Sequence, residues 1–445
     1  MKVSVRSGLV VAASLLVTFG VWRWANHVLV PVYTANAIAR GRPIGNNSDL
    51  YPVWLTTVEV LSQGRTPYSR QLTSDIQKGF YGRELDPRKS ADPTNLQAFV
   101  YPLYVVFLLA PTVTLPFANA AEIFRWLLLI CIACSVPLWM HAVGFHPRRL
   151  FTASAMMLAV SNFPAVMEDR QQNLSALVVL LLACSVAATV RHWLTLSGFL
   201  LSLSTIKPQL SVLLIAWMLL WAMSDWKERR RLVWSFVITW LSLLAAATAI
   251  SPNWMQGFWA AIQAYRSYAM GPSIFQMLLP PILAIPVIAM LLVFVGVICW
   301  QWRKAQPGSN QFAWTLALLV AATVTLTAQA PHYQLLLLPA LLALVASADA
   351  IRRMGFLVRA LAKATWACLL WQWGAALGLA LCSIFEPASR LRMVAELPIY
   401  TLLALPVVTL FAVVSAVLWM QLPRHIVKSE IDTEVCLMRD RLVAE

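Results

Sequence analysis

The sequence predicts an all-α, polytopic membrane protein, and three observations support this fold class. The chain has 445 residues, of which 60% are hydrophobic and 12% are charged, and its mean hydropathy is +0.70. Soluble domains carry about 25% charged residues. Hydrophobic stretches of about 20 residues recur along the whole length, which is what a membrane-spanning helix requires. Lys and Arg are clustered between these stretches, as they are in the cytoplasmic loops of membrane proteins.

About twelve hydrophobic stretches are predicted to be transmembrane helices. The first follows Lys2 and Arg6 and resembles a signal peptide, but no small-residue cleavage site follows it, so we predict an uncleaved helix. The predicted helices cover residues 8–28, 122–143, 150–166, 173–190, 194–206, 208–224, 232–250, 276–300, 312–330, 333–349, 364–384 and 398–421.

The basic clusters predict the orientation of these helices. All of them lie on one side if both termini are cytoplasmic, so we predict a protein of the plasma (inner) membrane in that orientation. A single integral-membrane domain then covers residues 1–425, and a cytoplasmic tail covers 426–445. The net charge of +15 fits contact with anionic lipid better than contact with nucleic acid. The clusters are HPRR (146–149), RH (191–192), KERRR (227–231), RK (303–304), RRMGFLVRALAK (352–363) and RHIVK (424–428).

Residues 98–117 do not fit this pattern. They are hydrophobic but are interrupted by Pro102, Pro111 and Pro116, and a full crossing here would invert every later loop. We therefore predict interfacial or re-entrant helices on the outer side, following a polar outer loop at 29–97. Non-helical backbone at membrane depth must be buried in protein or line a wet cavity. The turn that begins at Tyr101 would form part of the wall of such a cavity.

Two charged or titratable residues interrupt hydrophobic runs on the predicted outer side. Lys207 lies in TIKPQ (205–209), where the following proline breaks the helix and leaves backbone donors free. One interpretation is an anion site formed by the ammonium and these donors. The other is that the lysine side chain snorkels to the membrane interface. His332 lies in APHYQ (330–334), followed by Tyr333. In a functional role, its imidazole would donate a hydrogen bond to a phosphate or transfer a proton. The alternative is a hydrogen-bonded residue at a helix end without a function in the reaction.

The turn EDRQQN (168–173) is the densest polar cluster between the helices. Beside Arg170, the side chains of Gln172 and Asn173 offer both the donors and the acceptors that sugar hydroxyls or a phosphate would need. The alternative for Asn173 is an N-cap of the helix that follows.

Asp49 stands at the head of a short aromatic, amphipathic segment in GNNSDLYPVW (45–54). The carboxylate could cap a helix, or it could act as a general base on an attacking hydroxyl. Partial burial would raise its pKa toward a useful value.

Five blocks, in this order, resemble glycosyltransferase family 87, whose members use polyprenyl-phosphate mannose. The first block contains Asp49, Gly64 and Tyr68, and in the third block Gln171 stands where the family has Gly. The blocks are SDLYPVWLTTVEVLSQGRTPY (48–68), FVYPL (99–103), RQQNLSALVVLLLAC (170–184), LSGFLLSLSTIKPQL (196–210) and APHYQLLLLP (330–339).

This resemblance implies a fold of the GT-C superfamily with its active site on the outer face. It implies an inverting transfer of a sugar, expected to be mannose, from a polyprenyl monophosphate to a glycolipid or glycan acceptor. By position, Asp49 would be the catalytic base, and Lys207 and His332 would bind the donor phosphate. Substrate-binding positions would be Arg170, Gln172, Asn173, Tyr101 and Tyr333.

Several alternatives remain at this stage. Relatives of similar fold transfer arabinofuranose, and a flippase for a lipid-linked sugar or an accessory subunit would also be helical. Transporters place their sites near the midplane, whereas the polar interruptions here share one face. No cofactor is expected, although Asp49 with Glu168 or Asp169 could hold a divalent ion if these carboxylates converge.

Overall fold

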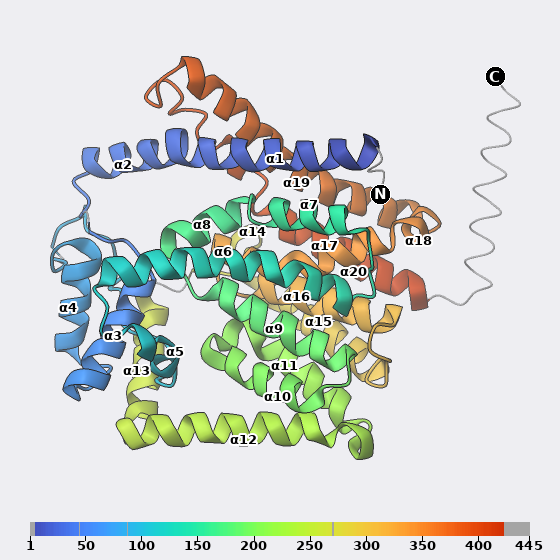
Figure 1. The fold of residues 1–445 in the computed structure, drawn as a ribbon, viewed down its shortest axis with the longest axis horizontal. Coiled ribbons are helices and arrows are strands. Elements are labelled where there is room, and N and C mark those ends of the chain that lie inside the picture. The colour runs from blue at the N-terminus through green and yellow to red at the C-terminus, as the bar shows by residue number, and fades with distance from the viewer. Residues whose placement is uncertain (1–4, 44, 87, 269–270, 422–445) are drawn as a thin grey trace, which may run out of the picture.

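The structure, a computed structural model, describes residues 5–43, 45–86, 88–268 and 271–421. These residues form helices and loops, with no β-strand among them. The helices α1, α2, α6 and α12 lie roughly parallel, with α12 along one edge, while α19 crosses behind α1 at an angle (Figure 1). The predicted all-α class is therefore confirmed for this part of the chain. The predicted tail at 426–445 lies outside the described residues.

The helical elements are joined by connections of different length, the longest lying between α4 and α5. Those labelled η are a π-helix (η1) and 3-10 helices (η2 to η5). In chain order they are α1 (Val5–Trp24), η1 (Ala25–Leu29), α2 (Val30–Ala39), α3 (Leu50–Gln63), α4 (Arg70–Tyr81), α5 (Val105–Leu109), η2 (Ala110–Thr112), α6 (Phe117–Ala142), α7 (Arg149–Ala159), α8 (Phe163–Gln171), α9 (Ser175–Val190), α10 (Leu194–Leu203), η3 (Ser204–Ile206), α11 (Pro208–Met223), α12 (Trp226–Ile250), α13 (Trp254–Tyr268), α14 (Ile274–Leu278), α15 (Pro281–Gln301), α16 (Asn310–Leu326), η4 (Pro331–Leu337), α17 (Leu338–Ala346), α18 (Ala348–Arg352), α19 (Phe356–Phe385), η5 (Leu397–Ile399) and α20 (Ala404–Gln421).

Six helices in the described part of the chain are long and apolar enough to cross a membrane, or seven if the bent pair α7 and α8 counts as one span. Five further apolar helices have only 10–17 residues. The protein is thus a multi-pass membrane protein, while the predicted count of about twelve spans stays unconfirmed. The six candidate spans are Gly8–Ala39, Phe117–Ala142, Trp226–Ile250, Pro281–Gln301, Phe356–Phe385 and Leu397–Gln421.

Two predicted boundaries are wrong. The outer loop does not begin at residue 29, because the first helix continues through η1 and α2 to Ala39, with a proline tolerated in the first turn of α2. The single helix predicted at 150–166 is two helices bent by 57°. The second of them, α8, is started by Asn162, whose side chain accepts a hydrogen bond from the Ala165 amide at 2.8 Å. Residues 168–171 therefore belong to a helix and not to a turn.

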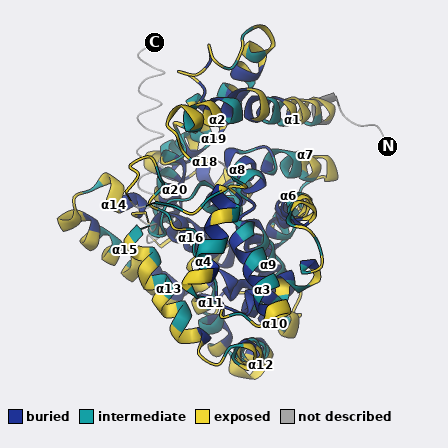
Figure 2. Cartoon of the chain, turned by 90° about the vertical axis from the view of Figure 1, so that its left-hand side faces the viewer, coloured by how far each residue is buried: buried dark blue, intermediate teal, exposed yellow. Residues whose placement is uncertain are grey.

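Two helices, α4 and α13, were not predicted from the sequence. Figure 2 looks onto the end of the molecule where α3, α4 and α13 lie, and it shows α13 and α12 with exposed outer faces around a buried centre formed by α9 and α16. In Figure 1 the described start of α1 and the described end of α20 lie at the opposite end of the long helices.

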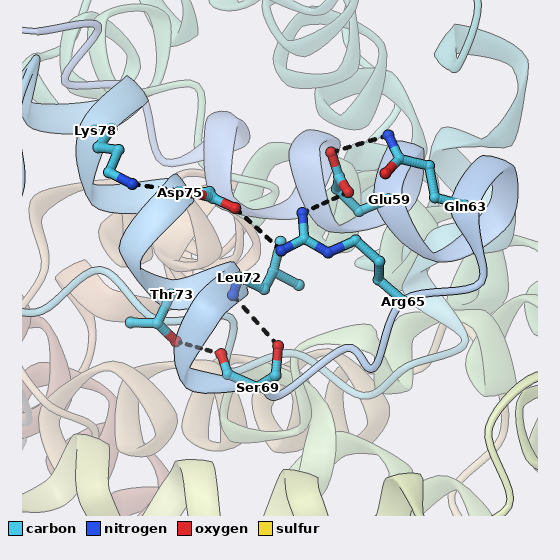
Figure 3. Close-up of polar contacts among 8 residues, drawn as sticks. All are labelled: Glu59, Gln63, Arg65, Ser69, Leu72, Thr73, Asp75 and Lys78. Atoms are coloured by element: carbon cyan, nitrogen blue, oxygen red, sulfur yellow. Dashed lines mark hydrogen bonds and ion pairs between the residues drawn. The ribbon is translucent and has the colours of Figure 1, made fainter.

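The connection between α3 and α4 is held by charges and by a cap (Figure 3). Arg65 donates to Glu59 of α3 at 2.7 Å and to Asp75 of α4 at 3.1 Å. Ser69 starts α4 by accepting a hydrogen bond from the Leu72 amide at 3.3 Å. These contacts fix the far end of α3, the helix that Asp49 precedes.

Between residue 98 and the start of α6 at Phe117, the chain forms only α5 and η2, which are too short to span a membrane. The segment is anchored inside the protein, since the Tyr104 hydroxyl lies 3.0 Å from the Thr205 carbonyl oxygen and 2.9 Å from its Oγ1. Val105 and Leu109 are fully buried. The re-entrant arrangement stays a prediction, and the segment places Tyr101 next to the break before α11.

Candidate active site

Asp49 is the residue before α3, but its side chain does not cap that helix. Its carboxylate oxygen Oδ2 instead accepts a hydrogen bond from Nδ2 of Asn173 at 2.8 Å. Its backbone amide donates to the Gln171 carbonyl oxygen at 2.6 Å, so the loop before α3 is bound to the end of α8. The capping interpretation of Asp49 is therefore wrong, and the carboxylate belongs to a polar cluster formed by distant segments.

Asn173 lies in the break between α8 and α9, where Gln172 ends α8 in a left-handed conformation with φ of 53°. Its oxygen Oδ1 accepts hydrogen bonds from Lys207 Nζ and, at 2.8 Å, from the Ser175 hydroxyl. The Asn173 side chain does not cap α9. The capping interpretation is wrong here too, since the amide bonds a carboxylate on one side and an ammonium on the other.

Lys207 is only 2% exposed and separates η3 from α11. Besides Asn173, its Nζ donates to Ser175 Oγ at 2.9 Å, and it lies 5.7 Å and 5.3 Å from the ring centroids of Tyr101 and Tyr333. A buried ammonium held between two aromatic rings does not snorkel to the interface. The ammonium has three donor hydrogens, and Asn173 and Ser175 take two of them.

His332 joins the same cluster through the end of α8. It is buried in η4, and its Nδ1 lies 3.1 Å from Gln171 Oε1. Its ring packs edge-on against Tyr333 with centroids 4.8 Å apart, and the Tyr333 hydroxyl accepts from Gln209 at 3.3 Å. Five of the residues predicted from the sequence are thus brought together: Asp49, Asn173, Lys207, Tyr101 and Tyr333, with His332 adjoining.

Gln172 and Arg170 are placed differently. Gln172 accepts from the Ser48 hydroxyl at 2.6 Å and donates to the Ala121 carbonyl at 2.6 Å, so it ties the loop before Asp49 to α6. Arg170 donates to Asn26 of the π-helix, and its Nε lies 3.8 Å from Asp169 Oδ2. These contacts direct both side chains to neighbouring helices, and their substrate-binding roles stay predictions.

Sequence reasoning missed the contributions of Ser175 and Tyr265. Ser175 follows Asn173 by two positions, and its hydroxyl bonds both Asn173 and Lys207 at the start of α9. Tyr265 lies on α13 and is partly buried. Its burial, and next the negative charge of Asp49, raise the pKa of its hydroxyl. Nothing in the local sequence connects α13 with the segment around Asp49.

Burial raises the pKa of Asp49 above the ordinary value of 3.8. The hydrogen bond from Asn173 and the positive charge of Lys207 act in the opposite direction, because both stabilise the ionised carboxylate. The residue as a whole is only partly buried, so it is not sealed from solvent. It therefore combines the access and the raised pKa that a general base needs.

The described residues contain no group of three or more His, Cys, Asp or Glu side chains arranged to hold a metal ion. Asp169 is held by Arg125, with Nε to Oδ1 at 2.8 Å. The expectation that the protein works without a cofactor stays a prediction.

The arrangement presents a carboxylate and an ammonium on opposite sides of one amide. Such a pair can deprotonate a nucleophile on one side and stabilise an anionic leaving group on the other. In comparison with known proteins, a model of glycosyltransferase family 87 matches residues 99–339, which is more than half of the chain. The match includes Asn173, Lys207 and His332 and leaves Asp49 outside it. No curated protein matches this chain.

Proposed function

The chain belongs to glycosyltransferase family 87 and is a membrane glycosyltransferase, and on this premise we propose that it transfers a hexose from a polyprenyl monophosphate sugar to an acceptor hydroxyl, with Asp49 as general base. The observation that carries the proposal is the contact of one side chain, Asn173, with both Asp49 and Lys207. Base and phosphate-binding group are thereby fixed relative to each other before any substrate arrives.

The proposed reaction is a single displacement. The acceptor oxygen attacks the anomeric carbon while Asp49 takes its proton, and the bond between that carbon and the phosphate oxygen breaks. The electron pair of this bond leaves with the polyprenyl phosphate, which gains a negative charge. Attack opposite to the leaving group inverts the anomeric configuration, and it requires base and phosphate site to flank the carbon.

Lys207 and His332 are proposed to bind the donor phosphate. The third hydrogen of the Lys207 ammonium supplies a charge-assisted hydrogen bond, which strengthens as the phosphate becomes more negative. Tyr101 and Tyr333 hold the ammonium between their rings and present aromatic faces and hydroxyls next to the transferred sugar. The lipid tail of the donor remains in the bilayer and holds the donor at the site. A sugar nucleotide has no such tail, so it is not expected to be a substrate.

The sugar is proposed to be mannose and the acceptor a glycolipid or glycan on the extracytoplasmic face. A transporter function has no support from the family, and transfer of arabinofuranose from a lipid-linked donor is the alternative. The test is a donor screen with the purified protein in lipid nanodiscs. Polyprenyl-phosphate mannose, glucose and arabinofuranose are each offered with candidate glycolipid acceptors, and products are identified by mass spectrometry. Turnover of a sugar nucleotide, or of none of the lipid-linked sugars, would contradict the proposal.

A further inference from the structure

Glu168 is a fully buried carboxylate that the proposed mechanism does not use. It lies on α8, and its Oε1 accepts a hydrogen bond from the Ala176 amide in the first turn of α9 at 2.8 Å. Its Oε2 is buried without a hydrogen-bond partner in the described part of the chain. A buried charge with an unsatisfied oxygen is costly unless an opposite charge lies nearby.

Lys207 is that opposite charge. Ser175 accepts from its Nζ at 2.9 Å, and the next residue, Ala176, donates to Glu168, so the first turn of α9 holds both groups. Glu168 and Asp49 are the carboxylates whose charges act on Lys207. The structure shows no direct hydrogen bond between Glu168 and Lys207, and the two groups are instead held by the adjacent residues Ala176 and Ser175.

The other groups around Glu168 do not compete for this role. Among the titratable side chains that face it in the described structure, Lys207 is the one cation. Those side chains are Lys207 before α11, Asp49 before α3, Tyr101 before α5, Tyr333 of η4 and Cys131 of α6, and His332 of η4 faces Lys207.

We propose that Glu168 is a positioning residue that acts through Lys207, and that its negative charge, held at the start of α9 beside Ser175, keeps the ammonium in place to receive the donor phosphate. The inference rests on the proposed function, because it assigns Lys207 to the phosphate. The simpler role for Glu168 is to accept a hydrogen bond from the start of α9. That role needs only an acceptor oxygen, whereas the proposed one needs a charge.

Glu168→Gln separates the two roles, since it keeps an oxygen for the Ala176 amide and removes the charge. We expect the alkaline limb of kcat/KM for the polyprenyl-phosphate donor to move to lower pH by about one unit or more. The matched control is Glu122→Gln, which neutralises an exposed carboxylate on α6 and is expected to leave the profile unchanged. An alkaline limb that is unchanged in Glu168→Gln overturns the inference. Failure of the proposed function itself looks different, because the unmodified protein would then show no turnover of the donor.

A second measurement compares unfolding temperatures and therefore needs neither turnover nor a folded Glu168→Gln single variant. Lys207→Met leaves Glu168 without its counter-charge, so the double variant Lys207→Met/Glu168→Gln is expected to unfold at a higher temperature than Lys207→Met at pH 8. A double variant that unfolds at the same or a lower temperature contradicts the pairing.

Discussion

The Asp49 carboxylate accepts a 2.8 Å hydrogen bond from the side-chain amide of Asn173, a residue 124 positions later in the chain. This contact joins the loop before α3, which lies outside the family match, to the turn between α8 and α9 inside it. The same amide bonds Lys207. It therefore fixes the base of the proposed reaction relative to the group that receives the leaving phosphate.

The pH dependence of transfer should report the environment of Asp49. A base is active in its ionised form, so activity rises with pH as the carboxylate loses its proton. Because burial raises the pKa of Asp49, the acidic limb of kcat/KM should lie above the ordinary 3.8. Asn173→Ala removes a hydrogen bond that stabilises the ionised form, so the limb should move to still higher pH. Initial rates measured from pH 4 to pH 9 test this, with the exposed Asn46→Ala as control. A limb that stays in place in Asn173→Ala would contradict the assignment.

Lys207→Ala should weaken donor binding far more than acceptor binding. Loss of a charge-assisted hydrogen bond to phosphate predicts a donor KM about 10- to 100-fold higher. The acceptor KM should change by less than about threefold, because the acceptor lies on the Asp49 side. Steady-state kinetics with each substrate varied in turn make the comparison. The control is Lys78→Ala, since Lys78 is exposed and pairs with Asp75 on α4 (Figure 3). An unchanged donor KM in Lys207→Ala would remove the lysine from the phosphate site.

The sequence was sufficient to predict the all-α class, and it singled out several of the residues that the structure brings together, whose catalytic roles stay predictions. Charged or amide side chains within apolar runs are costly in a membrane, so Lys207 and Asn173 could be recognised as candidate site residues from the sequence. The position of Asp49 in an aromatic segment served the same purpose. The hydrogen bonds that connect these residues were not predictable, because contacts between segments far apart in the chain do not change the local hydrophobic periodicity.

The errors have physical causes as well. Hydropathy does not reveal that α7 and α8 are separated by a capped break, since Asn162 and Pro164 are compatible with both a loop and a helix start. The helix α13 is amphipathic and its apolar residues are mixed with polar ones, so no hydrophobic stretch marked it. The segment 168–173 was predicted to be polar, but hydropathy could not show that most of it ends a helix, with Glu168 buried and Arg170 bonded to Asn26.

The packing of α10 against α12 should be sensitive to one methyl group. A Cβ added at Gly198 would lie 2.2 Å from the Leu232 carbonyl oxygen and 2.9 Å from the Phe236 amide nitrogen, both backbone atoms of α12. Gly198→Ala should therefore destabilise the protein by about 1–3 kcal/mol. Gly296→Ala on α15 is the matched control, because nothing lies within 4 Å of its Cβ and alanine favours a helix by about 0.5–1 kcal/mol. Thermal unfolding in detergent compares the two, and equal midpoints would show that the helices do not pack so closely.

The predicted orientation places the loop between α4 and α5 outside the cell. In a cysteine-free background, Ser90→Cys should react with a membrane-impermeant maleimide in intact cells, because this exposed residue lies in the loop. Lys304→Cys, in the connection between α15 and α16, should react only after permeabilisation. The reverse pattern would place the site on the cytoplasmic side.

The most direct test of the account is the turnover of purified Asp49→Asn with a polyprenyl-phosphate sugar. Asparagine keeps the size of the side chain and cannot accept a proton, so transfer should fall by about 100-fold to 10,000-fold while the protein still folds. Asp75→Asn, on α4, should retain activity, since Asp75 is engaged in partly exposed ion pairs with Arg65 and Lys78. If folded Asp49→Asn transfers sugar at the rate of the unmodified protein, Asp49 is not the catalytic base.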